Sequence, residues 1–150
     1  MIELYIDADA CPVKDEALKV ARRHGLKVHM VSNAWMRGDG DPTVNRVVVT
    51  EGPDAADDWI VEHIGAGDIV LTQDIPLAAR CLEKRAEAIG PTGKPFTGDN
   101  IGMALAMREL SAHLRETGAI KGYNPSHTKK DRSRFLEALE QAIQKIRRNA

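Results

Sequence analysis

Three aspartates stand just after separate predicted strands, where their carboxylates could together hold a divalent cation. Asp7 follows the apolar run IELYI, Asp57 lies early in a predicted helix after VNRVVVT, and Asp74 ends DIVLTQD. Carboxylates about 5 Å apart repel by roughly 3 kcal/mol per pair at an effective dielectric near 20, so protonation or a cation must offset the repulsion. Because the donor set is all oxygen, it favours Mg²⁺ or Mn²⁺ over zinc. Such an ion could orient a phosphodiester and activate a water for attack on it.

The register of the second predicted helix separates Asp57 from the neighbouring acids. Ile60 and Ile64 lie three and seven positions beyond Asp57, which places Asp57 on the core-facing stripe of the helix. A purely solvating acid is not expected on that stripe. Asp54 is interpreted as the N-cap of the helix, and Asp58 as a solvated acid in its first turn.

Strand-like and helix-like segments alternate along the chain. Strands are predicted at 2–6, 26–32, 44–50, 68–74 and 86–89. Helices follow the first, third, fourth and fifth strands, the first over about 12–24 and the fourth over about 99–116, and a last helix carries Phe135, Leu139, Ala142, Ile143 and Ile146. Because parallel neighbours need crossover connections, we expect a single three-layer α/β domain over 1–150. The expected sheet is five-stranded, mostly parallel and ordered 3-2-1-4-5, with an added C-terminal helix.

Composition and charge indicate an ordinary soluble domain. The 150 residues are 43% hydrophobic and 29% charged, which excludes collagen-like and wholly disordered chains. The formal net charge is -1, so nucleic acid or another charged partner must be met by a local patch. Cys11 and Cys81 are too few for a disulfide framework, and no apolar run of ~20 residues could span a bilayer. We therefore expect a cytoplasmic protein without a membrane segment.

Five stretches of the sequence match a known bacterial family. They are YIDADACPVK at 5–14, DAAD at 54–57, DIVLTQDIPLAA at 68–79, FTGDNIG at 96–102 and DRSRF at 131–135. Through these motifs the chain resembles the YaiI/YqxD family along nearly its whole length. That family is grouped with PIN-like domains, which are metal-dependent nucleases of RNA or DNA. The resemblance implies a PIN-like fold with an acidic metal site.

The resemblance also implies roles for individual acids. Asp7 matches the PIN-like acid after the first strand, Asp57 the acid of the middle helix, and Asp74 the acid of a Thr-x-Asp pattern. The middle acid of PIN nucleases is typically Glu, so this chain departs from the pattern there. Asp99, at the start of the fourth predicted helix, is the candidate fourth acid. Asp9 is an extra acid of the DADACP motif, and it either serves the metal or caps the first helix.

Basic residues that could contact nucleic acid concentrate near the C-terminus. Residues 129–150 hold seven basic and three acidic side chains, which leaves the rest of the chain acidic. Arg132 and Arg134 of the DRSRF motif, together with Arg108, are the candidate nucleic-acid contacts. The alternative for the basic last turn is a solvated helix end that complements the helix dipole.

Several further residues have both a functional and a structural interpretation. Cys11 is either a nucleophile at a helix start or a small buried residue. Trp35 and Met36 could stack on a base or pack beneath their loop, and His127 could contact a phosphate. The FTGDN start of the fourth predicted helix either receives a phosphate or is an ordinary capped helix start.

These patterns favour a metal-dependent nuclease that acts on nucleic acid, with RNA as the expected substrate and Mg²⁺ or Mn²⁺ as the cofactor. One alternative is a non-catalytic RNA-binding or interaction domain with the same fold, because it could keep both the acids and the basic residues. A second alternative is a haloacid-dehalogenase-like phosphatase, because YIDAD resembles the start of its first motif. The late paired acids of that family are missing, which counts against this second alternative.

Overall fold

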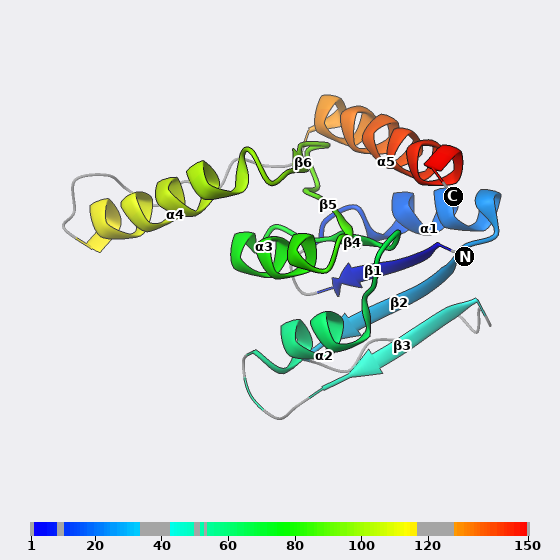
Figure 1. The fold of residues 1–150 in the computed structure, drawn as a ribbon, viewed down its shortest axis with the longest axis horizontal. Coiled ribbons are helices and arrows are strands. Elements are labelled where there is room, and N and C mark those ends of the chain that lie inside the picture. The colour runs from blue at the N-terminus through cyan, green and yellow to red at the C-terminus, as the bar shows by residue number, and fades with distance from the viewer. Residues whose placement is uncertain are drawn as a thin grey trace.

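A sheet of parallel strands with one antiparallel edge runs through the centre of the molecule (Figure 1). The computed structural model describes residues 2–8, 11–33, 43–49, 52, 54–116 and 128–149. The strands in this part of the chain are β1 (Glu3–Asp7), β2 (Lys27–Ser32), β3 (Val44–Val48), β4 (Ile69–Leu71), β5 (Glu87–Ile89) and β6 (Pro95–Phe96). Their order is β3-β2-β1-β4-β5-β6, with β6 alone antiparallel among them.

The parallel part of the sheet confirms the predicted strand order. β1 pairs with β2 on one side and β4 on the other, so the order reverses beside β1. The central strands are built from aliphatic residues that pack on both faces, such as Leu4 and Ile6 on one face and Val70 on the other, each 0% exposed. Ligands of such sheets bind at the carboxyl ends of the strands next to this reversal. We call that end of the sheet the carboxyl edge.

The sixth strand, β6, is an addition to the five predicted strands. It lies in the stretch 90–98, whose glycines and prolines predict a loop. Only two residues of this stretch pair with β5. The turn before it needs glycine at position 93, where φ is +84° and a Cβ would lie 2.4 Å from the backbone carbonyl of Arg134. Pro95 is tolerated because β6 is an edge strand.

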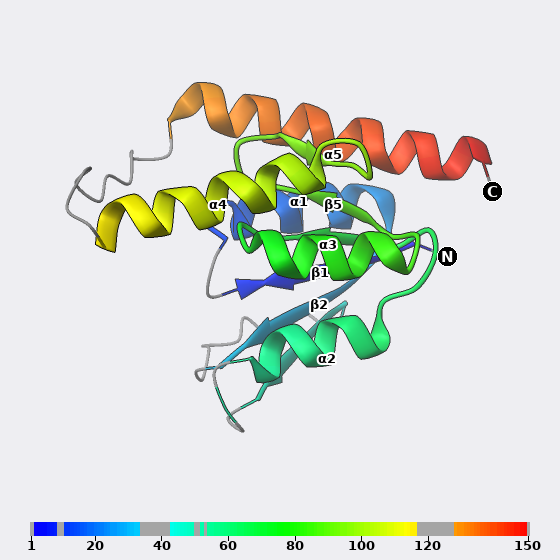
Figure 2. The same ribbon diagram turned by 60° about the vertical axis from the view of Figure 1, so that its left-hand side comes forward.

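Helices cover both faces of the sheet (Figures 1 and 2). They are α1 (Lys14–His24), α2 (Ala55–His63), α3 (Ile75–Glu83), α4 (Ile101–Glu116) and α5 (Lys129–Asn149). One apolar core forms between the sheet, α1 and α5, and a second forms between the sheet, α2 and α3. None of the described helices is both long enough and apolar enough to cross a membrane.

The C-terminal helix α5 is present as predicted and forms part of an outer layer. Its Phe135, Leu139 and Ile143 are each 0% exposed and pack with the core on the α1 side of the sheet. The helix begins with a reciprocal cap, in which Thr128 and Asp131 each donate a backbone N–H to the other's side-chain oxygen at 3.1 Å. This cap and the buried stripe fix the helix against the body of the domain.

Helix α4 differs because it leaves large apolar side chains in contact with solvent. Met103, Met107 and Leu110 are 69%, 51% and 49% exposed. The helix packs against α3 and extends past the sheet on the side toward which the arrows of β1 and β2 point (Figure 1). Helix α4 therefore extends beyond the carboxyl edge.

Candidate functional site

Asp7 is buried at the carboxyl edge and held by a hydroxyl. It ends β1 and is 5% exposed. Thr72 directly follows β4, and its Oγ1 donates a hydrogen bond of 2.8 Å to Asp7 Oδ2. The same Thr72 oxygen accepts the backbone N–H of Asp74 at 2.9 Å. One buried hydroxyl thus links the aspartates that follow the two central strands.

Asp74 is positioned by the start of helix α3. Its Oδ1 accepts the backbone N–H of Leu77 at 3.1 Å, which makes Asp74 the N-cap of the helix. Pro76 in the first turn favours a helix start at this position. The cap fixes the orientation of the Asp74 carboxylate at the carboxyl edge.

Asp57 lies in the first turn of α2 and is half-buried. Burial, followed by the negative charges of Asp74 and Asp7, raises the pKa of the Asp57 carboxyl to about 7. A side-chain hydrogen bond between Asp57 and Asp74 also raises this pKa, and the charge of Asp54 adds a smaller contribution. The structure therefore brings the three predicted aspartates into electrostatic contact from three separate elements.

The donor chemistry of this cluster fits a hydrated hard cation. The ligating atoms on offer are carboxylate oxygens with an excess of negative charge, which Mg²⁺ and Mn²⁺ prefer. Within the described residues no three His, Cys, Asp or Glu side chains form a group that could hold a metal ion. Mg²⁺ usually keeps several waters and binds through one or two carboxylates, so the Asp57 and Asp74 pair satisfies that mode. Asp9, a further predicted ligand, lies outside the described residues.

The family model for proteins described as uncharacterised BCR, YaiI/YqxD family, matches residues 5–145 of the chain. The chain belongs to this family. A UPF0178 protein of Parvibaculum lavamentivorans is 65% identical over 148 residues, covering 99% of this chain and 97% of that protein. A UPF0178 protein of Rhodospirillum rubrum is 63% identical over 148 residues, covering 98% of this chain and 99% of that protein. No solved structure gives a significant match.

Other acids of this YaiI/YqxD family member lie apart from the three aspartates or have different partners. Asp99 is exposed in the turn before α4, and among the described residues it has no hydrogen bond with Asp7, Asp57 or Asp74. Thr97 and Asn100 cap that helix instead, through hydrogen bonds of 2.8 and 3.2 Å. Asp54 occupies the predicted N-cap position of α2, but its side chain makes no capping hydrogen bond there. Asp58 is exposed and pairs with Arg80 at 3.0 Å.

The DRSRF motif of the family has structural contacts in this chain. Its aspartate caps α5 and its phenylalanine is fully buried. Arg132 Nε lies 3.2 Å from Glu16 Oε1, which ties α5 to α1. The Arg134 side chain is exposed, while its backbone passes close to Gly93. Arg108 is exposed on α4.

Cys11 is a buried residue rather than an activated thiol. It is 6% exposed, and burial raises the pKa of its thiol to about 11. Of the two interpretations of Cys11, the structure favours the small buried residue, because desolvation outweighs the pKa-lowering effects of the neighbouring backbone hydrogen bond and lysine. The predicted contacts Trp35, Met36 and His127 lie outside the described residues.

Sequence reasoning gave no role to Thr72. This residue is 1% exposed, and its hydroxyl lies between Asp7 and Asp74. The Thr-x-Asp spacing was the available signal. A threonine two positions before an N-cap residue can accept the backbone N–H of that residue with its hydroxyl oxygen, as Thr72 does for Asp74. Ser32, at the end of β2 and also 1% exposed, is a second buried hydroxyl at this edge.

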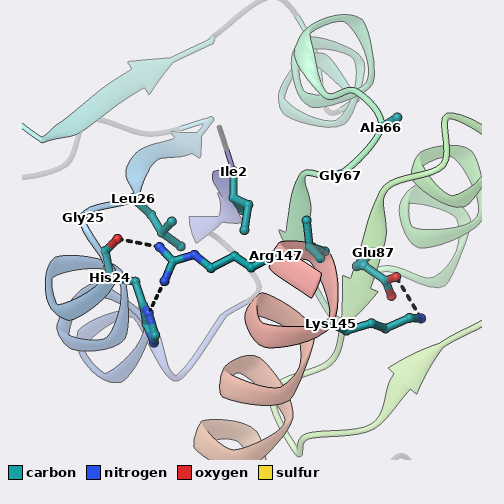
Figure 3. Close-up of a pocket in the computed structure, with 10 residues that line it drawn as sticks. Ile2, His24, Gly25, Leu26, Ala66, Gly67, Glu87, Lys145 and Arg147 are labelled. Atoms are coloured by element: carbon teal, nitrogen blue, oxygen red, sulfur yellow. Dashed lines mark hydrogen bonds and ion pairs between the residues drawn. The ribbon is translucent and has the colours of Figure 1, made fainter. Parts of the chain in front are cut away.

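A cavity of about 630 Å³ lies at the opposite, amino end of the strands (Figure 3). Its floor includes Ile2 and Leu26, and its cations come from the last turns of α5. Both cations are engaged: Lys145 pairs with Glu87 at 3.2 Å, and Arg147 donates a 2.8 Å hydrogen bond to the His24 carbonyl. This cavity is separate from the aspartate cluster.

Proposed function

We propose that this YaiI/YqxD family protein is a phosphodiesterase that uses Mg²⁺ or Mn²⁺ to cleave RNA. The observation that carries the proposal is that the charges of Asp74 and Asp7 act on the Asp57 carboxyl at the carboxyl edge, beside the reversal of strand order. Such a cluster is electrostatically unfavourable without a proton or a cation. The RNA substrate rests on the PIN-like resemblance of the motifs that contain these aspartates.

Each residue of the cluster has a distinct role in this proposal. Asp57 and Asp74 hold the cation, because their carboxyl groups contact each other and the cation would replace the proton between them. Asp7 adds negative charge that acts on Asp57, and Thr72 fixes the orientation of Asp7 through the 2.8 Å hydrogen bond. When bound, the cation would activate a water and stabilise the leaving oxygen. Asp9 is an additional candidate ligand.

The test measures cleavage of a labelled single-stranded RNA with Mn²⁺, with Mg²⁺ and with EDTA. Asp57→Asn and Asp74→Asn should each lower the rate by about 100-fold or more, the scale of losing one electrostatic contact to a transition state. Asp58→Asn is the matched control, since Asp58 lies in the same helical turn but is exposed and paired with Arg80. It should retain nearly full activity.

Other results of this experiment would replace the proposal. Equal RNA binding with and without metal, and no cleavage under either condition, would favour the non-catalytic binding domain. Hydrolysis of p-nitrophenyl phosphate without RNA cleavage would favour the phosphatase. Cleavage that persists in both Asp57→Asn and Asp74→Asn would show that the aspartate cluster is not the site.

A further inference from the structure

A second cavity opens between the start of α3, β6 and the exposed face of α4. Its volume is about 510 Å³, within the ~300–1,000 Å³ range of ligand pockets. Ile75 lines it, and Ile75 directly follows Asp74 in the chain. The cavity therefore includes the residue next to Asp74 in the chain and continues along α4.

The apolar lining of this cavity comes from side chains that are unusually exposed. Met103 and Met107 are 69% and 51% exposed, and they face the cavity together with Phe96 of β6. Methionine is flexible and polarisable, so it adapts to ligands of varied shape and makes favourable contacts with aromatic rings. A flat base, which every nucleotide carries, suits such a surface.

The polar lining is positively charged. Lys94 and Arg108 line the cavity, and no acidic residue is among the described residues around it. None of the ion pairs in the part of the chain that the structure describes includes Lys94 or Arg108. The cations of the amino-end cavity differ, since Lys145 pairs with Glu87 and Arg147 bonds to His24. Lys94 and Arg108 are thus available to an anionic ligand.

We infer that this cavity binds one nucleotide of a single-stranded RNA next to the bond that is cleaved. Met103, Met107 and Phe96 contact the base, and Lys94 and Arg108 contact the adjoining phosphates. The inference rests on the proposed phosphodiesterase function and assigns its substrate-binding surface. Charge favours RNA over a second copy of the chain, because a symmetric dimer through this face would bring the same two cations together.

The experiment measures binding of a fluorescent single-stranded RNA to the full chain in EDTA, over a range of salt concentrations. Lys94→Ala with Arg108→Ala should weaken binding at least tenfold at low salt. The slope of log affinity against log salt should fall by about 1.4, because each phosphate contact to a single strand contributes about 0.7. Met103→Ala with Met107→Ala should weaken binding with little change in slope. The matched control, Lys145→Ala with Arg148→Ala, removes two exposed cations at the other end of the molecule and should change both quantities much less.

The outcomes separate this inference from the proposed function. RNA binding with these dependences but no metal-dependent cleavage would retain the inference and reject the phosphodiesterase. Metal-dependent cleavage with KM and affinity unchanged in Lys94→Ala with Arg108→Ala would reject the inference alone. The inference would also be overturned by absence of RNA binding, or by an equal loss in the control. Light scattering tests for a dimer. If the wild type is a dimer, and Met103→Ala with Met107→Ala makes it a monomer without loss of RNA affinity, the exposed face of α4 binds a second copy of the chain and not RNA.

Discussion

The raised pKa of Asp57 makes a specific prediction about stability and pH. The carboxyl has an ordinary pKa of 3.8 and a pKa of about 7 in the folded protein. As pH rises above 3.8, the unfolded chain loses this proton while the folded protein keeps it. The folded state then binds more protons, so the free energy of unfolding falls with rising pH until the folded carboxyl also ionises near pH 7.

The size of the effect follows from the same two values. Each tenfold change in proton affinity corresponds to about 1.4 kcal/mol, so a fully buried group with this difference would lose about 4 kcal/mol. Asp57 is only half-buried, and solvent screening reduces the expected loss to ~1–2 kcal/mol. Asp57→Asn removes the loss, because asparagine does not ionise and its amide can donate to Asp74 as the protonated carboxyl does.

The assay is urea or thermal unfolding of the wild type and Asp57→Asn in EDTA, from pH 4 to pH 8. The two proteins should have equal stability near pH 4, and the variant should be ~1–2 kcal/mol more stable at pH 8. That gap corresponds to about 2–8 °C in Tm for a chain of this size. Mn²⁺ at pH 8 and 100 times Kd should stabilise the wild type by about 2.7 kcal/mol, which is enough to make it more stable than the variant.

Asp58→Asn serves as the control for this measurement. It removes an exposed ion pair with Arg80, so stability should change by less than about 1 kcal/mol. A wild type that gains stability relative to Asp57→Asn between pH 5 and pH 8 in EDTA would refute the reasoning. Such a result would mean that Asp57 forms a favourable contact as an anion.

Three further variants test other parts of the structure. Thr72→Val should destabilise the fold by ~1–3 kcal/mol, because Asp7 loses its buried donor, whereas Thr72→Ser should restore most of the loss; urea titration measures both. Gly93→Ala should cost about 3 kcal/mol or more, since it combines φ of +84° with a 2.4 Å clash, while Gly98→Ala, with open space around its Cβ, should cost less than 1 kcal/mol in thermal melts. Cys11 should resist iodoacetamide at pH 8 until the protein is unfolded, which mass spectrometry would show, and rapid alkylation of the folded protein would contradict its burial.

The parallel sheet was predictable because its strands carry strong local signals. Valine-rich runs such as 44–48 and the continuous apolar segment 69–71 favour strands regardless of their surroundings, and crossover rules then restrict the order. β6 was missed because a two-residue strand has no periodicity, and its turn residues are the same ones that make loops. Its pairing depends on tertiary contact with β5.

The candidate site was predictable only in part. The stripe position of Asp57 and the strand-end position of Asp74 follow from helix and strand periods, which act within a few residues. The hydroxyl of Thr72, 65 positions from Asp7, is a long-range contact that periodicity does not reveal. Likewise, the cap role of Asp131 could be read from its spacing to Thr128, whereas the pairing of Arg132 with Glu16 depends on how distant helices pack.

The placement of α5 beside α1 has a consequence for biosynthesis. The apolar face that Phe135, Leu139 and Ile143 cover belongs to strands made much earlier, so every nascent chain must emerge with that face still bare. At about 5–20 residues per second, the last helix takes on the order of one to several seconds to be translated. During that interval the growing polypeptide exposes an apolar surface to chaperones and to other nascent chains. A premature stop codon before α5 would make this surface permanent, and the truncated product is expected to aggregate or be degraded.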